Sequence, residues 1–348
     1  MIEESPQVGA LAERLLIALR RVTGEPALAY DGSPLALTGG FWAELVSIRL
    51  QNAPEGWRGP LVARVMPDAA TAAKETVFQA EVAGQGFPTP TVHASGGPNE
   101  GVNGRAFMVM DLAPGRPLLA GLDGLAAVAK LPSLVRRLPA TLADILARLH
   151  RLDPAPVQVR LEADGVARPG LEPMLTSLHD TAQRLGRVDL ADAAAWLRDH
   201  PPVSEPTVIC HGDLHPFNVL VDDAGTVTVL DWSAALLAPA TCDLGFTSLV
   251  LAEPPLLVPG SLKRFVRAAG RALSRRFVRV YERRAGQHVD RSSLAWHQAV
   301  VCLRALVEAA GWVASGTIDE RTGHPWVIAG DAFAARLQVL TGAPVTAR

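Results

Sequence analysis

The stretch that decides the fold reads Cys210-His211-Gly212-Asp213-Leu214-His215-Pro216-Phe217-Asn218-Val219-Leu220, and Asp231-Trp232-Ser233 follows shortly after it. Three short apolar runs rich in β-branched residues surround these positions, at 207–210, 218–221 and 226–230, and turn-forming residues at 222–225 separate the last two. Such runs predict a strand, a loop, a second strand, a turn and a third strand. We therefore expect Asp213 and Asn218 to lie beside Asp231 at one rim of a small sheet.

The side chains expected at this rim carry hard oxygen ligands. Two carboxylates and one amide oxygen suit Mg²⁺ rather than a soft metal. Asn218 and Asp231 are the candidate metal ligands, and Asp213 is the candidate group that takes a proton from an acceptor hydroxyl. A plainer alternative is a β-hairpin in which Asp and Asn serve only as turn residues. Turn chemistry, however, does not require the histidine, the spacing and the second aspartate together.

The same residues resemble the signature of protein kinases, H-R-D-L-x-x-x-N followed by D-F-G. Here the chain reads H-G-D-L-H-P-F-N and then D-W-S. Glycine in place of the arginine resembles the aminoglycoside-phosphotransferase-like (choline-kinase-like) family, whose members are small-molecule kinases with the protein-kinase fold. The resemblance implies a bilobal, protein-kinase-like α+β fold. Its N-lobe, an antiparallel sheet plus a helix, would span residues 1–111, its hinge 112–117, and its mostly helical C-lobe 118–348.

The N-lobe of this family binds the nucleotide phosphates, and the resemblance assigns four residues to that task. Gly39 and Gly40 would lay backbone N–H groups over the ATP phosphates, although a glycine pair between strands is also an ordinary hairpin turn. Arg64 occupies the position where the family usually has lysine, and Glu75 on the next expected helix is its candidate partner. Arginine keeps the charge and can grip phosphate with two donors. The alternative for Glu75 is a solvated helix face.

The apolar run that ends in a Pro/Gly connector at 106–117 resembles the hinge of kinase-like folds. By that resemblance Met110 flanks the adenine, Asp111 offers its carbonyl group, and Ala113 offers its N–H group. An ordinary core strand followed by a loop is the alternative. His215 stands where protein kinases have a lysine near the transferred phosphate, so it either assists there or has a neutral structural role.

Three further residues have supporting roles. Asp243 resembles the acid with which the family braces its catalytic loop from a helix start. His211 is expected to support the loop by hydrogen bonding, and His150 to pack or cap. Pro139 is expected in the first turn of a helix. Helical spacing of apolar residues predicts helices at 8–22, 70–83, 139–151, 171–187, 190–199, 263–284, 294–315 and 330–340.

Composition limits the possible partners and location. The chain has 348 residues, 49% of them hydrophobic, and a net charge of −2, so no global field attracts nucleic acid or an anionic membrane. Its three cysteines lack metal-type spacing and are expected to be reduced, which favours a cytoplasmic location. The acidic start of the sequence and the charged or proline residues that interrupt each apolar run lead us to expect neither a signal peptide nor a membrane span. The oligomeric state stays open.

Together these features predict an ATP- and Mg²⁺-dependent phosphotransferase that moves the γ-phosphoryl group to a hydroxyl of a small molecule, an antibiotic or a metabolite. GTP is an alternative donor. One rival is an inactive nucleotide-binding pseudokinase or scaffold, supported only by Arg64 in place of lysine. The other is a protein kinase, but the A-P-E and activation-loop features are missing.

The acceptor is addressed only by a basic ridge on the helix expected at 263–284. Basic residues recur there every fourth position, and Glu282 is the only acid among them; they are Lys263, Arg267, Arg271, Arg275, Arg279 and Arg283. If the ridge faced the acceptor site it would repel a cationic aminoglycoside, whereas a solvated ridge says nothing. We expect, with modest preference, a neutral or anionic hydroxyl acceptor.

Overall fold

A computed structural model describes residues 6–37, 43–57, 59–100, 102–119, 124–254 and 260–347, with the backbone alone for 6–7, 124–135 and 260–263. The chain divides into two compact units. The first comprises Met1–Leu118, Ala155–Arg168 and Phe217–Ala235, and the second Leu119–Pro154, Pro169–Pro216 and Leu236–Arg348. The first unit thus takes in two later segments that the expected contiguous boundaries assign to the C-lobe. The lobe boundaries themselves stay a prediction.

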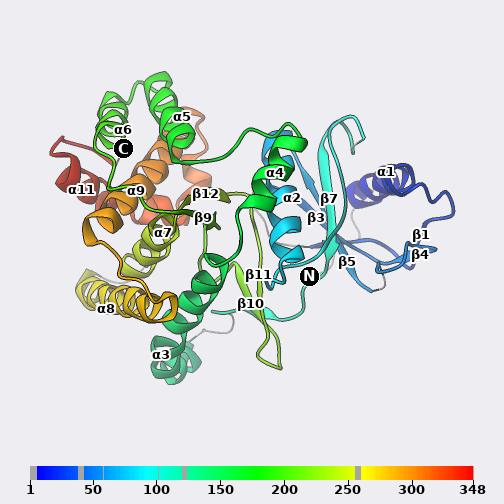
Figure 1. Cartoon of the computed structure of the whole chain (residues 1–348), viewed down its shortest axis with the longest axis horizontal. Helices are drawn as coiled ribbons and strands as arrows, with labels where there is room; N and C mark the ends of the chain where they lie inside the picture. The colour runs from blue at the N-terminus through cyan, green and yellow to red at the C-terminus, as the bar shows by residue number, and fades with distance from the viewer. Residues whose placement is uncertain are drawn as a thin grey trace. The chain divides into compact units, whose positions relative to one another are not determined.

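The first unit is built on a five-stranded antiparallel sheet in the order β2-β3-β5-β7-β6. Its strands are β2 (Leu35–Leu37), β3 (Glu44–Ile48), β5 (Leu61–Met66), β6 (Val92–Gly96) and β7 (Ala106–Asp111). A separate pair joins β1 (Ala29–Tyr30) to β4 (Leu50–Gln51). Two helices, α1 (Pro6–Thr23) and α2 (Ala69–Gly84), cover opposite faces of the large sheet (Figure 1). A third helix, α4 (Ala155–Ala163), contacts α2.

Alternation along β5 decides which side chains meet which helix. Successive strand residues point to opposite faces. Leu61, Ala63 and Val65 join the core that includes α1, whereas Met66 joins the core that includes α2. Arg64 therefore projects from the face that α2 covers.

The loop-and-hairpin region forms the predicted elements but not one sheet. β10 (Val219–Val221) and β11 (Val227–Val229) pair as an antiparallel hairpin, and β8 (Arg116–Pro117) pairs with β10 on its other side. The strand before the loop, β9 (Thr207–Cys210), instead pairs with β12 (Leu236–Pro239) in the second unit. The expectation of a single small sheet with one shared rim is wrong, because β9 takes its partner from beyond the hairpin.

Trp232 anchors the end of the hairpin within the first unit. Its ring is fully buried and meets Phe87 edge to face at 5.7 Å between centroids. The indole N–H donates to the Thr89 hydroxyl at 2.9 Å, and that hydroxyl donates to the Val229 carbonyl at 2.9 Å. A buried indole is stable only with such a partner for its N–H group. The contacts fix the segment that carries Asp231.

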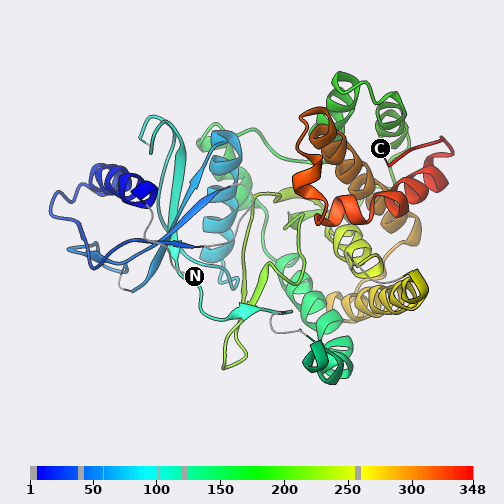
Figure 2. The ribbon, with the colours of Figure 1, turned by 180° about the vertical axis from the view of Figure 1, so that it is seen from behind.

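The second unit is mostly helical, as predicted. Its helices are α3 (Gly124–Leu149), α5 (Leu171–Arg184), α6 (Val188–Asp199), α7 (Ala240–Ala252), α8 (Gly260–Ala285), α9 (Arg291–Ala314), α10 (Pro325–Ile328) and α11 (Gly330–Thr341), with a 3₁₀ turn at Ile318–Arg321. The central helix, α9, contacts α5, α6, α7 and α11 (Figures 1 and 2). Most of its positions are buried. Pro139 lies inside α3 rather than in a first turn, a correction explained by the packing of α3 on α8, which outweighs the lost hydrogen bond.

The structure can be compared with the expectations for the cysteines and for membrane-spanning helices. Cys210, Cys242 and Cys302 are buried and free of disulfides, as expected. Within the described segments, none of the helices combines the length and the apolar character needed to cross a bilayer.

Helices α7 and α8 approach so closely at Gly270 that a side chain has no room. A Cβ atom there would lie 2.7 Å from the carbonyl oxygens of Leu251 and Ala252, which are backbone atoms of α7 and cannot swing aside. Gly311 in α9 offers a matched contrast, since a Cβ atom there would meet nothing within 4 Å.

We predict opposite effects for alanine at these two helical glycines. Gly311→Ala should stabilise the protein by about 0.5–1 kcal/mol through helix propensity. Gly270→Ala should destabilise it by about 1–2 kcal/mol, because overpacking outweighs that gain. Thermal and urea unfolding followed by circular dichroism would measure both. An equal stabilisation by the two substitutions would contradict the close approach of α7 and α8.

Candidate functional site

Arg64 joins two acids in the first unit. Its Nη1 lies 3.2 Å from Oε1 of Glu75 on α2, and its Nη2 lies 3.4 Å from Oδ1 of Asp231. The Glu75 side chain is 1% exposed and that of Arg64 12%. The predicted Arg64–Glu75 pair is confirmed, and the alternative of a solvated Glu75 is wrong.

Burial makes Glu75 dependent on its partner. Desolvation raises the pKa of Glu75 to about 7, while Arg64 opposes the rise and nearby Asp231 adds to it. The Arg64 Nε atom is buried and has no hydrogen-bond partner among the described residues. An arginine fixed on one acid and turned toward a second is a suitable cation for an anionic ligand such as phosphate.

Asn218 and Asp231 come together at the open end of the β10–β11 hairpin. The N–H group of Leu230 donates to the Asn218 carbonyl at 2.9 Å, which continues the ladder past Val219 and Val229. Asp231 adopts a left-handed backbone with φ 65°, a conformation that side-chain-bearing residues seldom take. Its Oδ1 accepts the Ser233 N–H group at 3.2 Å. Both side chains are partly exposed, and their carboxylate and amide oxygens fit a magnesium ion.

Asp213 lies in the second unit, on a loop braced by Asp243. The fully buried Asp243 carboxylate, in the first turn of α7, accepts the N–H groups of His211 at 2.8 Å and Gly212 at 2.7 Å. Gly212 has φ 75°, which glycine adopts without strain. The His211 Nδ1 atom accepts the Asp213 N–H group at 3.3 Å. The predicted brace by Asp243 and the supporting role of His211 are both confirmed.

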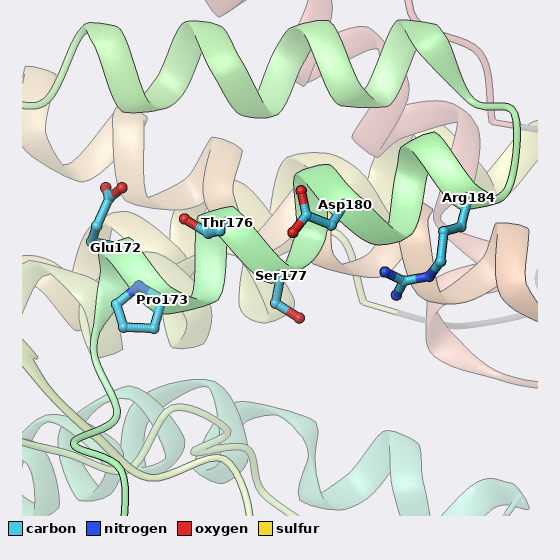
Figure 3. A pocket seen from close by; sticks show the side chains of 6 residues that line it. All are labelled: Glu172, Pro173, Thr176, Ser177, Asp180 and Arg184. Carbon is cyan, nitrogen blue, oxygen red and sulfur yellow. The ribbon is translucent and has the colours of Figure 1, made fainter.

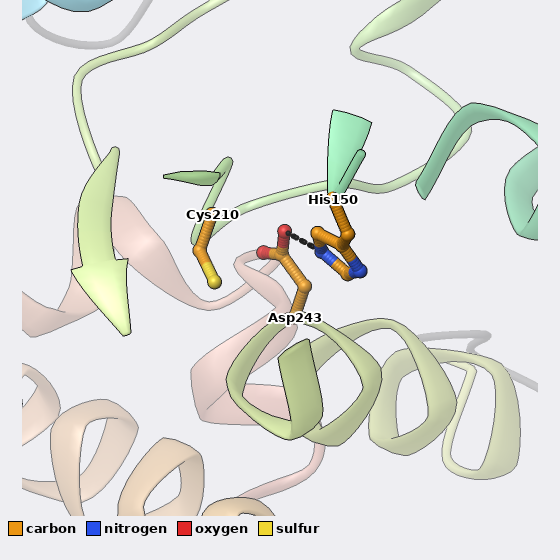
Figure 4. Close-up of side chains that lie close together, drawn as sticks. All are labelled: His150, Cys210 and Asp243. Carbon is orange, nitrogen blue, oxygen red and sulfur yellow. Dashed lines mark hydrogen bonds and ion pairs between the residues drawn. The ribbon is translucent and has the colours of Figure 1, made fainter. Parts of the chain in front are cut away.

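His150 completes the brace from α3. Its Nε2 lies 3.0 Å from Asp243 Oδ2 (Figure 4). Its Nδ1 lies 2.8 Å from the Tyr281 hydroxyl. His150, Cys210 and Asp243 also place their candidate ligand atoms within 4.8 Å of one another. Both Asp243 oxygens, however, already accept loop N–H groups, and burial raises the pKa of the Cys210 thiol well above its usual value. The cluster is therefore a hydrogen-bonded brace, which agrees with the packing role expected for His150.

Arg304 is a neighbour of Asp213 that the sequence interpretation missed. Its Nη2 lies 3.2 Å from Asp213 Oδ1, and its Nη1 donates to the Gly212 carbonyl at 3.2 Å. His215 Nε2 lies 3.6 Å from the other oxygen of Asp213. The role expected for His215 near the transferred phosphate stays a prediction. The signal for Arg304 was available in the sequence, since it interrupts the apolar run at 299–307.

The hinge residues lie where β7 ends and the connector begins. Met110 packs against the core that includes α2. The Asp111 N–H group donates to the Thr91 carbonyl at 3.1 Å, and its side chain pairs with His93 at 2.7 Å. Ala113 follows in the connector. Gly39 and Gly40 lie outside the described residues, so the phosphate-covering turn stays a prediction.

Two surface hollows contain none of the predicted site residues. One, of about 470 Å³, lies along α5 (Figure 3) and is lined by Glu172, Pro173, Thr176, Ser177, Asp180 and Arg184. The other, of about 520 Å³, follows α8 and is lined by Ala269, Ala272, Leu273, Arg276, Arg279 and Arg283. The described arginines of the basic ridge are solvent-exposed, and Arg267 pairs with Glu253 at 3.2 Å. The ridge therefore carries no information about the acceptor.

Comparison with known proteins starts with sequence. The profile of the phosphotransferase enzyme family matches residues 49–291. The aminoglycoside 3′-phosphotransferase of Streptomyces ribosidificus is 29% identical over 171 residues, which cover 45% of this chain. The match spans about half the length of that curated relative, 56% of it.

Solved structures extend the likeness to nearly the whole chain. A Ralstonia eutropha protein provisionally named an aminoglycoside phosphotransferase superposes with a TM-score of 0.67 at 20% identity, over 95% of this chain and 98% of its own. A mutant of aminoglycoside phosphotransferase APH(4)-Ia, solved with ADP and hygromycin B, gives a TM-score of 0.57 at 16% identity, over 93% and 96%. At such low sequence identity the structural likeness shows the fold alone, and it confirms the predicted protein-kinase-like α+β class. With the profile match covering most of its length, the chain belongs to the phosphotransferase enzyme family.

Proposed function

We propose that the protein transfers the γ-phosphoryl group of Mg·ATP to a hydroxyl of a small molecule. The observation that carries the proposal is the chain of contacts from Glu75 through Arg64 to Asp231. These contacts join the cation that we assign to the phosphates to the acid that we assign to the metal. A nucleoside triphosphate with its magnesium ion needs a phosphate-binding cation and a metal ligand close together.

The first unit supplies the nucleotide-binding residues in this proposal. Arg64 would contact the α- and β-phosphates, and Glu75 would hold its guanidinium in place. Asn218 and Asp231 would bind Mg²⁺, which when present neutralises the charge that develops during transfer. Met110 would flank the adenine, the Asp111 carbonyl and Ala113 N–H would bond to its edge, and Gly39-Gly40 would cover the phosphates. The nucleotide in the APH(4)-Ia complex supports a nucleotide donor, with GTP as an alternative to ATP.

The second unit supplies the group that acts on the acceptor. Asp213 would accept a hydrogen bond from the acceptor hydroxyl, orient it and take its proton. Asp243 and His211 keep the loop in one conformation, so the carboxylate needs little reorganisation. His215 would assist near the transferred phosphate.

The rival of an inactive nucleotide-binding scaffold depends on the missing lysine. Arg64 offsets this loss, because it keeps the cation and is held on Glu75 as the lysine of this family would be. A cytoplasmic location, where ATP is available, is part of the proposal and is supported by the three free thiols.

The proposed role of Asp213 leads to a prediction for its substitution. Asp213→Asn should lower turnover by roughly 10²–10⁴-fold, because the amide cannot accept the proton. ATP affinity and melting temperature should stay unchanged. Phosphate transfer from labelled ATP would be measured beside Asp192→Asn, which removes an exposed acid from α6. Wild-type turnover in Asp213→Asn would remove Asp213 from its assigned role.

The second prediction concerns Asp231. Asp231→Ala should weaken Mg²⁺-dependent binding of a non-hydrolysable ATP analogue by roughly 10- to 100-fold, the loss seen even for supporting residues of metal sites. Calorimetry with and without Mg²⁺ would separate this effect from the contact of Arg64 with phosphate. Asp223→Ala, in the exposed hairpin turn, is the matched control. Equal Mg²⁺ dependence in both variants would show that Asp231 is no ligand.

The third prediction concerns the acceptor. Since Arg304 offsets the negative charge of Asp213, that carboxylate attracts a polycation less strongly, and we expect neutral or anionic hydroxyl compounds to be phosphorylated in preference to polycations. A phosphate-transfer screen would compare kanamycin- and streptomycin-type drugs with macrolides, sugars and hydroxy acids. Efficient turnover of the aminoglycosides alone would contradict the preference.

A further inference from the structure

Arg304 makes two contacts that act on one point of the catalytic loop. One bond reaches the Asp213 carboxylate and the other the carbonyl of the preceding residue, Gly212. A guanidinium is planar, so two acceptors at 3.2 Å from its two Nη atoms set the direction of the carboxylate relative to the loop backbone. A lysine ammonium group, which acts as a point charge, would not fix the direction of the carboxylate.

The guanidinium is itself held by aromatic rings. Its central carbon lies 5.5 Å from the ring centroid of Phe246 on α7 and 5.8 Å from that of Trp326 on α10. The two rings meet edge to face at 6.1 Å. Such cation–π contacts restrict a long side chain that would otherwise be mobile.

A second acid fixes the position of Trp326. The indole N–H donates to Glu308 Oε2 at 3.0 Å, and Glu308 lies one helical turn after Arg304 on α9. Burial raises the pKa of Glu308, although Arg304 opposes the rise. Three elements of the second unit, α7, α9 and α10, therefore converge on one arginine side chain that is 24% exposed.

We propose that Arg304 is a positioning residue for phosphoryl transfer, which holds the Asp213 carboxylate in the orientation that receives the acceptor hydroxyl. The inference rests on the proposed function. It gives Arg304 no contact with the reacting atoms; its effect passes through Asp213 and the Gly212 carbonyl. Near the anionic phosphates of ATP, a carboxylate also needs a compensating cation, and the Arg304 charge lies within ion-pair distance.

Two substitutions of Arg304 separate the effect of its charge and its two hydrogen bonds from the effect of its packing. Arg304→Met keeps length and packing but loses both bonds, and should lower kcat by ~10- to 100-fold, the effect of a ~1 Å misplacement. Arg304→Lys keeps the charge and reaches one acceptor, so an intermediate kcat is expected. The KM for ATP should stay within about twofold in both, because ground-state nucleotide binding is untouched. Arg271→Met on α8, an exposed arginine, is the matched control.

Chemical rescue distinguishes positioning from a general packing effect. Millimolar guanidinium should restore part of the activity of Arg304→Ala, because it can occupy the vacated place beside Asp213. It should have no effect on wild-type protein or on an Arg271→Ala control. Loss of activity that the lysine variant and guanidinium both fail to relieve would overturn the proposal.

Hydrogen–deuterium exchange tests the inference without any turnover. The amides of His211–Leu214 should exchange faster in Arg304→Met than in wild-type protein and in Arg271→Met, because the loop loses two anchoring bonds. Unchanged exchange with unchanged kcat would overturn the inference alone. Absence of phosphate transfer from wild-type protein to any acceptor would instead overturn the proposed function, and with it the catalytic part of this inference.

Discussion

The buried carboxylate of Asp243 makes the hydrogen bonds on which the conformation of the Asp213 loop depends. An ionised acid without solvent exposure is stable only when its lone pairs are satisfied. Here two of the bonds come from consecutive loop N–H groups and another from His150. Leaving the buried donors unpaired would cost about 1–3 kcal/mol each. The loop conformation, the start of α7 and the end of α3 are thereby fixed by one charge.

Arg64 shows how a departure from the family pattern can be accommodated. An ammonium group would act as a point charge, whereas the guanidinium reaches Glu75 with one Nη atom and Asp231 with the other. Strand alternation on β5 turns the side chain to the face that α2 covers, so the geometry follows from the register. The replacement keeps the cation and adds a direct link to the acid assigned to the metal.

Local patterns in the sequence were sufficient for much of this arrangement. The hairpin follows from its apolar runs and turn residues, whereas the Arg64–Glu75 pair was expected from the resemblance to kinase-like small-molecule phosphotransferases. The pairing of β9 with β12 could not be predicted, because strand partners are chosen by non-local packing. The contact of Arg304 with Asp213 joins residues far apart in sequence, and only the fold of α9 against the loop brings them together. Pro139 inside α3 likewise reflects tertiary contacts that override a local preference.

The first unit is assembled from three separate segments of chain, and this has a consequence for biosynthesis. Domains generally fold as units, and N-terminal ones begin to do so while the ribosome is still working. The sheet can form early, but the unit is complete only after residues 217–235 have emerged, since they supply the hairpin and the Trp232 anchor. Until then Trp232 cannot make its contacts with Thr89 and Phe87. The first unit therefore stays incomplete in the nascent chain while several helices are synthesised, and its exposed apolar surface is then most open to chaperones.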